Sequence, residues 1–505
     1  MAEIKRIYFV GIKGVGMTGL AIIAKEAGFL VRGSDVTEEF LTDSVLLKKD
    51  IPVDQNFNEH DLETFIDGKN DETLIITTAA HDGLSNPQCV YASSQNIQIL
   101  THGQAVGYFM EGSLFNRIFK GVSVLGCHGK TTVTAMISIA LKSAGMDPTY
   151  TVGTSEIFPD GLAGHLGTSG YFVAEADEFV SDAKTDRTVK FLYQHPETAV
   201  INNIDFDHPD VYKDLGEVIS TFQKFCLENV KENGTLLMNG DDTNVIDIKA
   251  QVEAKRPDIK VVTYGENKEN SLVISNFKEI GWGSEFEVTF ENKSLGVFTL
   301  SVPGYYNAKN SLAVVALFLS LGIDTETTKK AVAAFKGTKR RQEIIGEMEG
   351  GALVVDDYAH HPEEIEKTLG AVKKAYQTRK IVAVFQPHTL SRTVSLQNEF
   401  ALCFKAADEV VFLPIFTSKR EGEVDYSDLY SSIESKMKEN TTKVTFLKDS
   451  RLKDQLSFSP YFFSENRKAV VKYIRTQYGS AEYVIVILGA GDVYKIAYDL
   501  SETAV

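Results

Sequence analysis

The stretch GVSVLGCHGKTTVTAMISIALKSAG, residues 121–145, decides the fold at the centre of this 505-residue chain. An apolar, β-branched run leads into a glycine-bearing turn and then a helical pattern, which predicts strand, loop and helix. A helix N-terminus after such a turn directs backbone N–H groups and the positive end of the helix dipole at an anion. Residues 126–132 (GCHGKTT) therefore predict a phosphate-binding loop, with a spacing shorter than GxxxxGK[ST].

Two side chains of this loop have expected roles in phosphoryl transfer. Lys130 adds a full positive charge at the β- and γ-phosphates, and Thr131 offers a hydroxyl to Mg²⁺. The alternative is a glycine-rich turn with a surface lysine and no ligand. We expect ATP to lie along the whole loop, which comprises Gly126, Cys127, His128, Gly129, Lys130, Thr131 and Thr132.

A second glycine-rich turn, GIKGVGMTG at 11–19, follows the predicted strand RIYFVGI and leads into a predicted helix over 17–28. It contains GxGxxG, and Asp35 ends the next apolar run, where an acidic residue meets a ribose in dinucleotide sites. This pattern alone favours NAD and an oxidoreductase. Any nucleotide diphosphate suits such a turn, however, and a turn without a ligand is a further alternative.

Carboxylates and a histidine follow two predicted strands of the central region. Glu175 lies in YFVAEADE, and His208 closes ETAVINNIDFDH. Because ligands bind beyond the carboxyl ends of parallel strands, we expect both side chains near Lys130. Carboxylate and imidazole ligands beside the Thr131 hydroxyl predict an Mg²⁺ site. The alternative is a set of solvated acids in loops.

The whole chain has the length of about three domains. Hydrophobic residues make up 43% of it, so each domain can bury a core. Short β-branched runs alternate with helical patterns, which is typical of α/β domains with parallel sheets. Breaks in this alternation predict domains at 1–120, 121–336 and 337–505.

Net charge and cysteine content limit the classes of partner and the cellular compartment that we expect. The net charge of −17 argues against nucleic acid and against an anionic membrane surface as partners. No apolar run is long enough to span a membrane. The four cysteines are far apart and show no CxxC spacing, so we expect a reduced, cytoplasmic protein.

The last region carries two polar clusters, DDYAHHP at 356–362 and PHTLSR at 387–392. Neighbouring histidines rarely point at one metal, and no third ligand stands at a useful spacing, so zinc is disfavoured. An acidic protein needs local positive charge to hold anionic substrates. We expect that charge from Arg340, Arg341, His388 and Arg392.

In this order the motifs resemble those of the Mur ligases, the ATP-dependent amide-forming enzymes of peptidoglycan precursor synthesis. The chain carries, in sequence, GIKGVGMTGLA, GCHGKTT, EADE, NNIDFDH, PGYYNAKN, GTKRRQE, DDYAHHP, FQPHTLSRT and LGAGDVY. The resemblance implies a Rossmann-like UDP-binding domain, a central P-loop ATPase-like domain and a C-terminal Rossmann-like domain for the amino acid. It also implies ATP and Mg²⁺ as cofactors.

The resemblance assigns a role to each matching residue. Catalysis would use Lys130, His208, Arg341, His360 and His388, with His360 or His388 accepting the proton of the amine. ATP would contact the loop and also Asn307, Asn310, Arg341 and Asp357. The UDP-linked substrate would contact Gly11, Gly14, Gly16, Gly19, Asp35, His388 and Arg392. Mg²⁺ would bind Thr131, Glu175 and His208.

Different motifs of the chain favour different amine substrates. FQPHTLSRT and the ends of the chain resemble members that join L-alanine to the carboxylate of UDP-N-acetylmuramate through an acyl phosphate. The central stretch KTDRTVKFLYQHPETAVINNIDFDHPD resembles members that attach an intact tripeptide in cell-wall recycling. Tyr306, Gln342 and Thr389 depart from the family pattern. We expect L-alanine, because the third domain selects the amine, and we expect a monomer or a homodimer.

Overall fold

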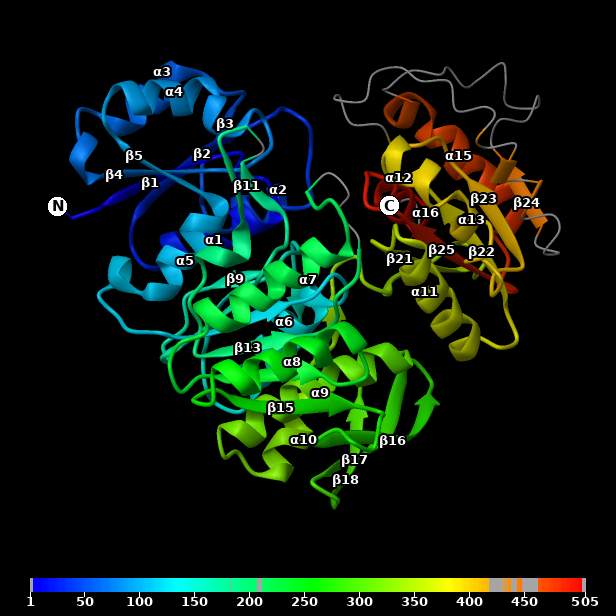
Figure 1. Cartoon of the computed structure of the whole chain (residues 1–505). Helices are drawn as coiled ribbons and strands as arrows, with labels where there is room; N and C mark the ends of the chain where they lie inside the picture. Colours follow the sequence, from blue (N-terminus) through cyan, green and yellow to red (C-terminus); the bar gives the residue numbers. More distant parts are fainter. Residues whose placement is uncertain are drawn as a thin grey trace. The chain divides into compact units, whose positions relative to one another are not determined.

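The structure is a computed structural model, in which the chain forms two compact units. It describes residues 3–182, 184–206, 211–416, 429, 432–433, 435–436, 443–446 and 462–501. The first unit comprises Met1–Phe277, Glu285–Ser301 and Asn307–Thr338, and the second comprises Lys278–Ser284, Val302–Tyr306 and Lys339–Val505. The helices and strands of both units are labelled in Figure 1.

The first sheet has five parallel strands in the order β3-β2-β1-β4-β5. Its strands are β1 (Arg6–Val10), β2 (Leu30–Asp35), β3 (Val53–Gln55), β4 (Thr73–Thr77) and β5 (Gln98–Thr101). Its helices are α1 (Val15–Glu26), α2 (Asp43–Lys48), α3 (Glu59–Ile66), α4 (Pro87–Ser94) and α5 (His102–Glu111). The predicted strand over 6–12 and the helix over 17–28 are confirmed within a few residues.

The side chains of β1 show that this sheet is covered by helices on both faces. Ile7 and Phe9 belong to one buried cluster, with α1 and α5, whereas Tyr8 and Val10 belong to another, with α3 and α4. Alternate side chains of a strand point to opposite faces, so a strand buried on both faces is apolar throughout.

The second sheet has ten strands in the order β18-β17-β16-β15-β14-β13-β6-β10-β7-β9. Their bounds are β6 (Lys120–Leu125), β7 (Thr149–Thr151), β9 (Gly164–His165), β10 (Tyr171–Glu175), β13 (Thr198–Ile201), β14 (Thr235–Asn239), β15 (Lys260–Gly265), β16 (Leu272–Ile280), β17 (Gly283–Phe290) and β18 (Lys293–Leu300). The strands from β15 to β7 are parallel, and β9 runs antiparallel to β7 at the edge. Strand β6 therefore carries the phosphate loop into the middle of a parallel sheet.

Helices and short strand pairs complete this part of the chain. The helices are α6 (Lys130–Ser143), α7 (Leu215–Lys224), α8 (Thr243–Lys255), α9 (Tyr305–Ser320) and α10 (Thr325–Ala334). Two antiparallel pairs that the sequence pattern did not predict join β8 (Ile157–Phe158) to β19 (Gly337–Thr338) and β11 (Val180–Asp182) to β12 (Asp186–Val189). Phe172 and Ala174 of β10 lie in the same buried cluster as Ile7, so the first two sheets share a core.

The second unit holds a sheet in the order β20-β21-β25-β22-β23-β24, in which only β20 is antiparallel to its neighbour. The strands are β20 (Glu343–Glu347), β21 (Leu353–Asp357), β22 (Lys380–Phe385), β23 (Glu409–Phe412), β24 (Lys443–Phe446) and β25 (Tyr483–Leu488). Its helices include α11 (Pro362–Ala375), α12 (Leu390–Ser395), α13 (Gln397–Phe400), α15 (Phe462–Tyr478) and α16 (Tyr494–Ser501). Pro362 occupies the first turn of α11, as predicted.

Three α/β sheets therefore confirm the predicted fold class. The domain limits at 120 and 336 stay predictions. Among the described residues no helix is long and apolar enough to cross a membrane. Cys89, Cys127, Cys226 and Cys403 are buried, and none of them is part of a disulfide bond.

Candidate functional site

The phosphate loop joins the end of β6 at Leu125 to the start of α6 at Lys130. Gly126 and Gly129 have φ values of +143° and +80°, a region that favours glycine. A Cβ on Gly129 would lie 2.6 Å from Asn202 Nδ2. Both glycines are therefore required by the shape of the turn and by its close packing.

Two asparagines hold the loop from the end of β13. The backbone N–H of His128 donates to Asn203 Oδ1 at 2.8 Å. The carbonyl of His128 accepts from Asn202 Nδ2 at 2.9 Å and from Asn203 Nδ2 at 2.8 Å. Both asparagines belong to the motif NNIDFDH, but the sequence pattern does not assign them this role. These bonds fix the loop before any ligand binds.

Lys130 is buried at the start of α6. Its ammonium donates to the carbonyl of Gly126 at 2.6 Å and lies 2.8 Å and 2.6 Å from the two carboxylate oxygens of Glu178. Burial lowers the pKa of Lys130, but the carboxylates of Glu178, Glu175 and Asp177 outweigh it, so the net pKa lies above its ordinary value. Lys130 is thus charged, and its ammonium lies against the backbone of the loop. Its contact with phosphate stays a prediction.

Thr131 and Glu175 meet beside the loop. The Thr131 hydroxyl donates to Glu175 Oε1 at 3.1 Å, and the N–H of Gly153 donates to Glu175 Oε2 at 2.9 Å. Burial raises the pKa of Glu175. A hydroxyl and a carboxylate are oxygen donors that suit Mg²⁺, so these two predicted ligands are brought together. The third, His208, lies outside the described residues.

The predicted adenine contacts lie at the start of α9. Asn310 lies beside the loop: a Cβ on Gly129 would be 3.3 Å from Asn310 Oδ1, which also accepts from Asn202 Nδ2 at 3.2 Å. Asn307 lies one turn earlier in the same helix. Between them Lys309 pairs with Asp241 at 2.6 Å, which ties this turn of α9 to the end of β14. The structure therefore places Asn310 at the loop.

The four glycines of the first turn differ in what surrounds them. A Cβ would lie 2.3 Å from Thr78 Cγ2 at Gly11, 2.5 Å from His102 Nε2 at Gly16 and 2.5 Å from Thr151 Oγ1 at Gly19. At Gly14 the nearest atom would be 3.5 Å away, which is an ordinary contact. Gly14 is thus the glycine whose missing side chain the protein's own packing does not explain. That is consistent with close approach of a ligand.

Asp35 lies beneath this turn, 2% exposed. Its Oδ2 accepts the N–H of Lys13 at 2.7 Å and its Oδ1 accepts the N–H of Val36 at 2.8 Å. Burial raises the pKa of Asp35. The carboxylate therefore shapes the glycine turn, and its predicted contact with the UDP-linked substrate stays a prediction.

His102 packs against Gly16 of the turn. No sequence motif singles it out. Burial lowers its pKa to about 4, so the ring is neutral at pH 7. Nearby, Lys190 Nζ donates to Asp177 Oδ2 at 2.6 Å. Asp177 belongs to the motif EADE, whereas Lys190 belongs to no motif in the sequence.

Two adjacent arginines of the second unit have different surroundings. Arg340 is buried, and its guanidinium donates to Asp356 Oδ2 at 3.1 Å and to the carbonyls of Gly489 and Gly491 at 2.6 Å and 3.1 Å. These bonds hold the domain together, which differs from the expected role in substrate binding. The Arg341 side chain is 29% exposed, with Glu364 at 3.8 Å.

Asp357 ends β21 and is also fully engaged. Its carboxylate accepts from the Gln342 N–H at 3.0 Å, the Thr368 hydroxyl at 2.9 Å and the Ala359 N–H at 2.8 Å. Burial raises its pKa, although Arg341 opposes this. Gln342, which departs from the family pattern, thus meets Asp357 through its backbone.

The structure brings the two predicted proton acceptors together. The rings of His360 and His388 lie 6.0 Å apart, and His388 stacks on Phe416 at 5.4 Å. Burial, with His360 and Arg392 nearby, lowers the pKa of His388 to about 3. His388 is therefore a weak base at neutral pH.

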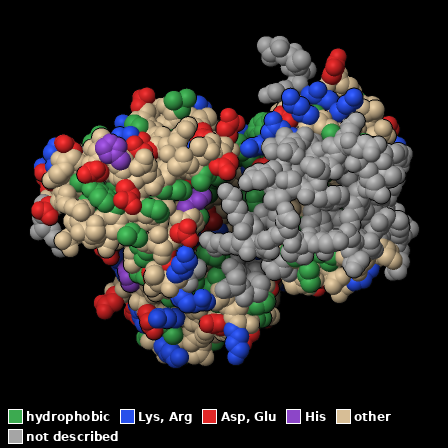
Figure 2. Space-filling model, turned by 90° about the horizontal axis from the view of Figure 1, so that it is seen from above, with side chains coloured by type: hydrophobic (Ala, Val, Ile, Leu, Met, Phe, Trp, Pro, Cys, Tyr) green, Lys and Arg blue, Asp and Glu red, His purple; other side chains and the backbone are tan. Residues whose placement is uncertain are grey.

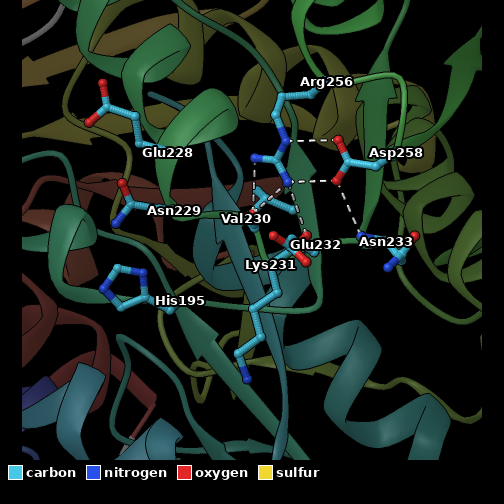
Figure 3. Close-up of a pocket in the computed structure, with 9 residues that line it drawn as sticks. All are labelled: His195, Glu228, Asn229, Val230, Lys231, Glu232, Asn233, Arg256 and Asp258. Atoms are coloured by element: carbon cyan, nitrogen blue, oxygen red, sulfur yellow. Dashed lines mark hydrogen bonds and ion pairs between the residues drawn. The ribbon is translucent and has the colours of Figure 1, made fainter.

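A polar hollow of about 620 Å³ lies elsewhere, between His195, the segment 228–233, Arg256 and Asp258 (Figure 3). These residues precede β13, β14 and β15, at the amino ends of parallel strands, whereas ligands bind at the carboxyl ends. Arg256 is engaged with Asp258 at 2.9 Å and 2.8 Å. Figure 2 shows acidic and basic side chains interspersed on one face of the molecule.

The fold and the glycine loop at 126–129 are typical of nucleotide-binding α/β proteins, and comparisons with known proteins are more specific. Residues 6–113 match the Mur ligase family catalytic domain, 124–318 the Mur ligase middle domain and 340–491 the Mur ligase glutamate ligase domain. The chain belongs to the Mur ligase family, which confirms the resemblance seen in its motifs.

Individual relatives cover the chain from end to end. The UDP-N-acetylmuramate--L-alanine ligase of Desulfitobacterium hafniense (strain Y51) is 36% identical over 98% of this chain and 99% of its own. The crystal structure of UDP-N-acetylmuramate-alanine ligase MurC from Thermotoga maritima matches with a TM-score of 0.76 at 27% identity, over 98% of both chains. A murein peptide ligase from Psychrobacter arcticus 273-4 shares the fold, with a TM-score of 0.68 at 22% identity over 99% of both chains.

Proposed function

We propose that this chain joins L-alanine to the carboxylate of UDP-N-acetylmuramate, with conversion of ATP to ADP and phosphate, in peptidoglycan precursor synthesis. The single observation that carries this proposal is the 36% identity over 98% of the chain to a ligase of that name. The chemistry of the loop also supports this proposal, because Lys130 is buried and charged there. We further propose that the reaction takes place in the cytoplasm.

The reaction needs an activated carboxylate, since a carboxylate is a poor electrophile. A carboxylate oxygen attacks the γ-phosphorus, the bond from that phosphorus to ADP breaks, and an acyl phosphate forms. The Lys130 ammonium neutralises charge on the phosphoryl group in transfer, and the loop amides hold it in place. The amine of alanine then attacks the acyl carbon, and the bond to phosphate breaks.

Mg²⁺ bound at Thr131 and Glu175 would neutralise phosphate charge. The attacking amine must also lose a proton. With the pKa of His388 near 3, we propose His360 as the acceptor. The roles of Arg341, Asp357, Arg392 and the glycine turn remain predictions from the family resemblance.

An isotope experiment tests the acyl phosphate and the substrate together. UDP-N-acetylmuramate with ¹⁸O in its carboxylate is incubated with ATP, Mg²⁺ and L-alanine, and the released phosphate is analysed by mass spectrometry. We expect one ¹⁸O atom per phosphate and a product heavier by one alanyl residue. Phosphate without label would rule out attack by the carboxylate on ATP.

A further inference from the structure

Helix α1 carries the glycine turn at its start and is fixed against the second sheet along its length. A Cβ on Gly164 of β9 would lie 2.3 Å from the carbonyl oxygen of Gly19, and a Cβ on Gly19 would lie 2.5 Å from Thr151 Oγ1 of β7. Helix and strand thus touch through their backbones. A contact this close leaves α1 little freedom to slide along the sheet.

At the other end of α1, His165 joins two carboxylates from different parts of the first unit. His165 Nδ1 lies 2.9 Å from Glu26 Oε2, and Nε2 lies 3.0 Å from Asp147 Oδ1. Ionised carboxylates only accept hydrogen bonds, so both ring nitrogens must donate, and the ring must be an imidazolium. We call Glu26, His165 and Asp147 the His165 clamp.

Other groups around the clamp favour the same charges. Glu26 also accepts from Lys49 Nζ at 2.6 Å and from the N–H of Leu166 at 2.8 Å. Asp147 accepts from the N–H and the hydroxyl of Thr168. The hydrogen bond from Glu26 raises the pKa of His165, against the opposing effect of burial.

Strand β7 connects the clamp to the phosphate loop. It pairs with β9 on one side and with β10, which ends at Glu175, on the other. Just beyond β7, the N–H of Gly153 donates to Glu175 Oε2 at 2.9 Å, and Glu175 accepts the Thr131 hydroxyl. A continuous path of packed backbone therefore runs from the glycine turn to the loop.

We propose that His165 is a positioning residue of the ligase, which holds the glycine turn at a fixed distance from the phosphate loop. The proposal rests on the function proposed above. A carboxylate bound through the first site must meet a γ-phosphate bound at the second, and displacement by about 1 Å can cost about 100-fold in rate. The clamp acts on the alignment of two bound substrates, not on the binding of either.

The test therefore measures kcat and the affinity for each substrate separately. His165→Ala should lower kcat at least tenfold, while the Kd of UDP-N-acetylmuramate and that of a non-hydrolysable ATP analogue, measured separately by calorimetry, stay within twofold. The control is His195→Ala, an exposed histidine of the same sheet region, which should leave kcat within twofold. Glu26→Gln, which keeps the size of the side chain but removes the charge and one acceptor oxygen, should lower kcat in the same direction.

Two results would overturn the positioning role. One is an unchanged kcat in both clamp variants, and the other is a loss of UDP-sugar affinity that accounts for the whole loss of rate. Amide hydrogen exchange needs no activity, and His165→Ala should speed exchange in α1 and β9 at least tenfold, while His195→Ala should not. If His165→Ala shows the exchange effect but the wild-type protein releases no phosphate, the ligase function is refuted and the clamp is a purely structural joint.

Discussion

The ammonium of Lys130 lies 2.6 Å from the carboxylate of Glu178, and the two side chains are 11% and 3% exposed. The cation that we assign to the ATP phosphates is therefore already compensated inside the protein. Removing one partner of such a buried pair leaves the charge of the other buried and unpaired, which typically lowers the free energy of unfolding by about 3–5 kcal/mol. Loss of activity and loss of stability must accordingly be separated.

Lys130→Met should lower ATP-dependent phosphate release by at least about 100-fold, since it removes a charge aimed at the transferring phosphoryl group. The Kd of UDP-N-acetylmuramate should stay within twofold, because the glycine turn belongs to another sheet. The double variant Lys130→Met/Glu178→Gln should regain thermal stability but not turnover. Near-normal phosphate release from the single variant would show that the loop has been misassigned.

Glu175→Gln should raise the Mg²⁺ concentration needed for half-maximal rate at least about tenfold, because a charged oxygen ligand becomes a neutral amide. A matched control is Glu197→Gln, at the opposite end of the same sheet, where the carboxylate accepts the N–H of Gly121. Titrations of rate against Mg²⁺ at saturating ATP compare them. An equal shift in both variants would count against a metal site at Glu175.

Gly14→Ala and Gly16→Ala should separate ligand approach from packing. Gly14 has φ −59° and room for a Cβ, so its alanine variant should keep its thermal midpoint while UDP-N-acetylmuramate binds at least tenfold more weakly. Gly16→Ala should unfold more easily, because its Cβ would meet His102. Thermal melts measure the stability of both variants, and calorimetry measures their affinity for UDP-N-acetylmuramate. Normal UDP-sugar affinity in Gly14→Ala would show that the turn is not part of the binding site.

The clamp predicts a pH dependence of stability with a definite sign. The folded pKa of His165 is raised above its ordinary value of about 6.5, so its contribution is fully present below about pH 6.5 and is lost as pH rises through the folded pKa. For Glu26, burial acts upward but His165 and Lys49 prevail and bring the pKa to about 2, so its contribution is lost as pH falls from about 4.5 towards 2. Urea unfolding of wild type and His165→Asn from pH 5 to pH 9 should show a stability difference that shrinks on the alkaline side. A constant difference would mean that the ring is not an imidazolium.

Much of the fold was predictable because the central parallel strands are apolar on both faces, and because β1 and β6 lead into glycine turns. The runs at β1, β6, β10 and β22 carry that signal, and Pro362 marks the start of α11. The short pairs β8–β19 and β11–β12 escaped prediction. They have only two to four residues each, which is too short for a periodic pattern of apolar residues to show.

The candidate site was predictable where one motif carries both position and chemistry, as at Lys130, Thr131 and Glu175. Residues that act through tertiary packing were not. His102 and His165 stand in ordinary polar stretches, and only the fold brings them against Gly16 and Glu26. Arg340 and Arg341 are adjacent and chemically identical, so the sequence could not tell which is buried.

The central claim is that L-alanine is the amine. The direct measurement is kcat/KM for phosphate release with UDP-N-acetylmuramate and ATP, offered either L-alanine or the cell-wall tripeptide under the same conditions. We predict rapid release with L-alanine, a slower but measurable rate with glycine, since one methyl group is worth about 10- to 200-fold, and none above background with the tripeptide. A higher kcat/KM with the tripeptide than with L-alanine would contradict the account.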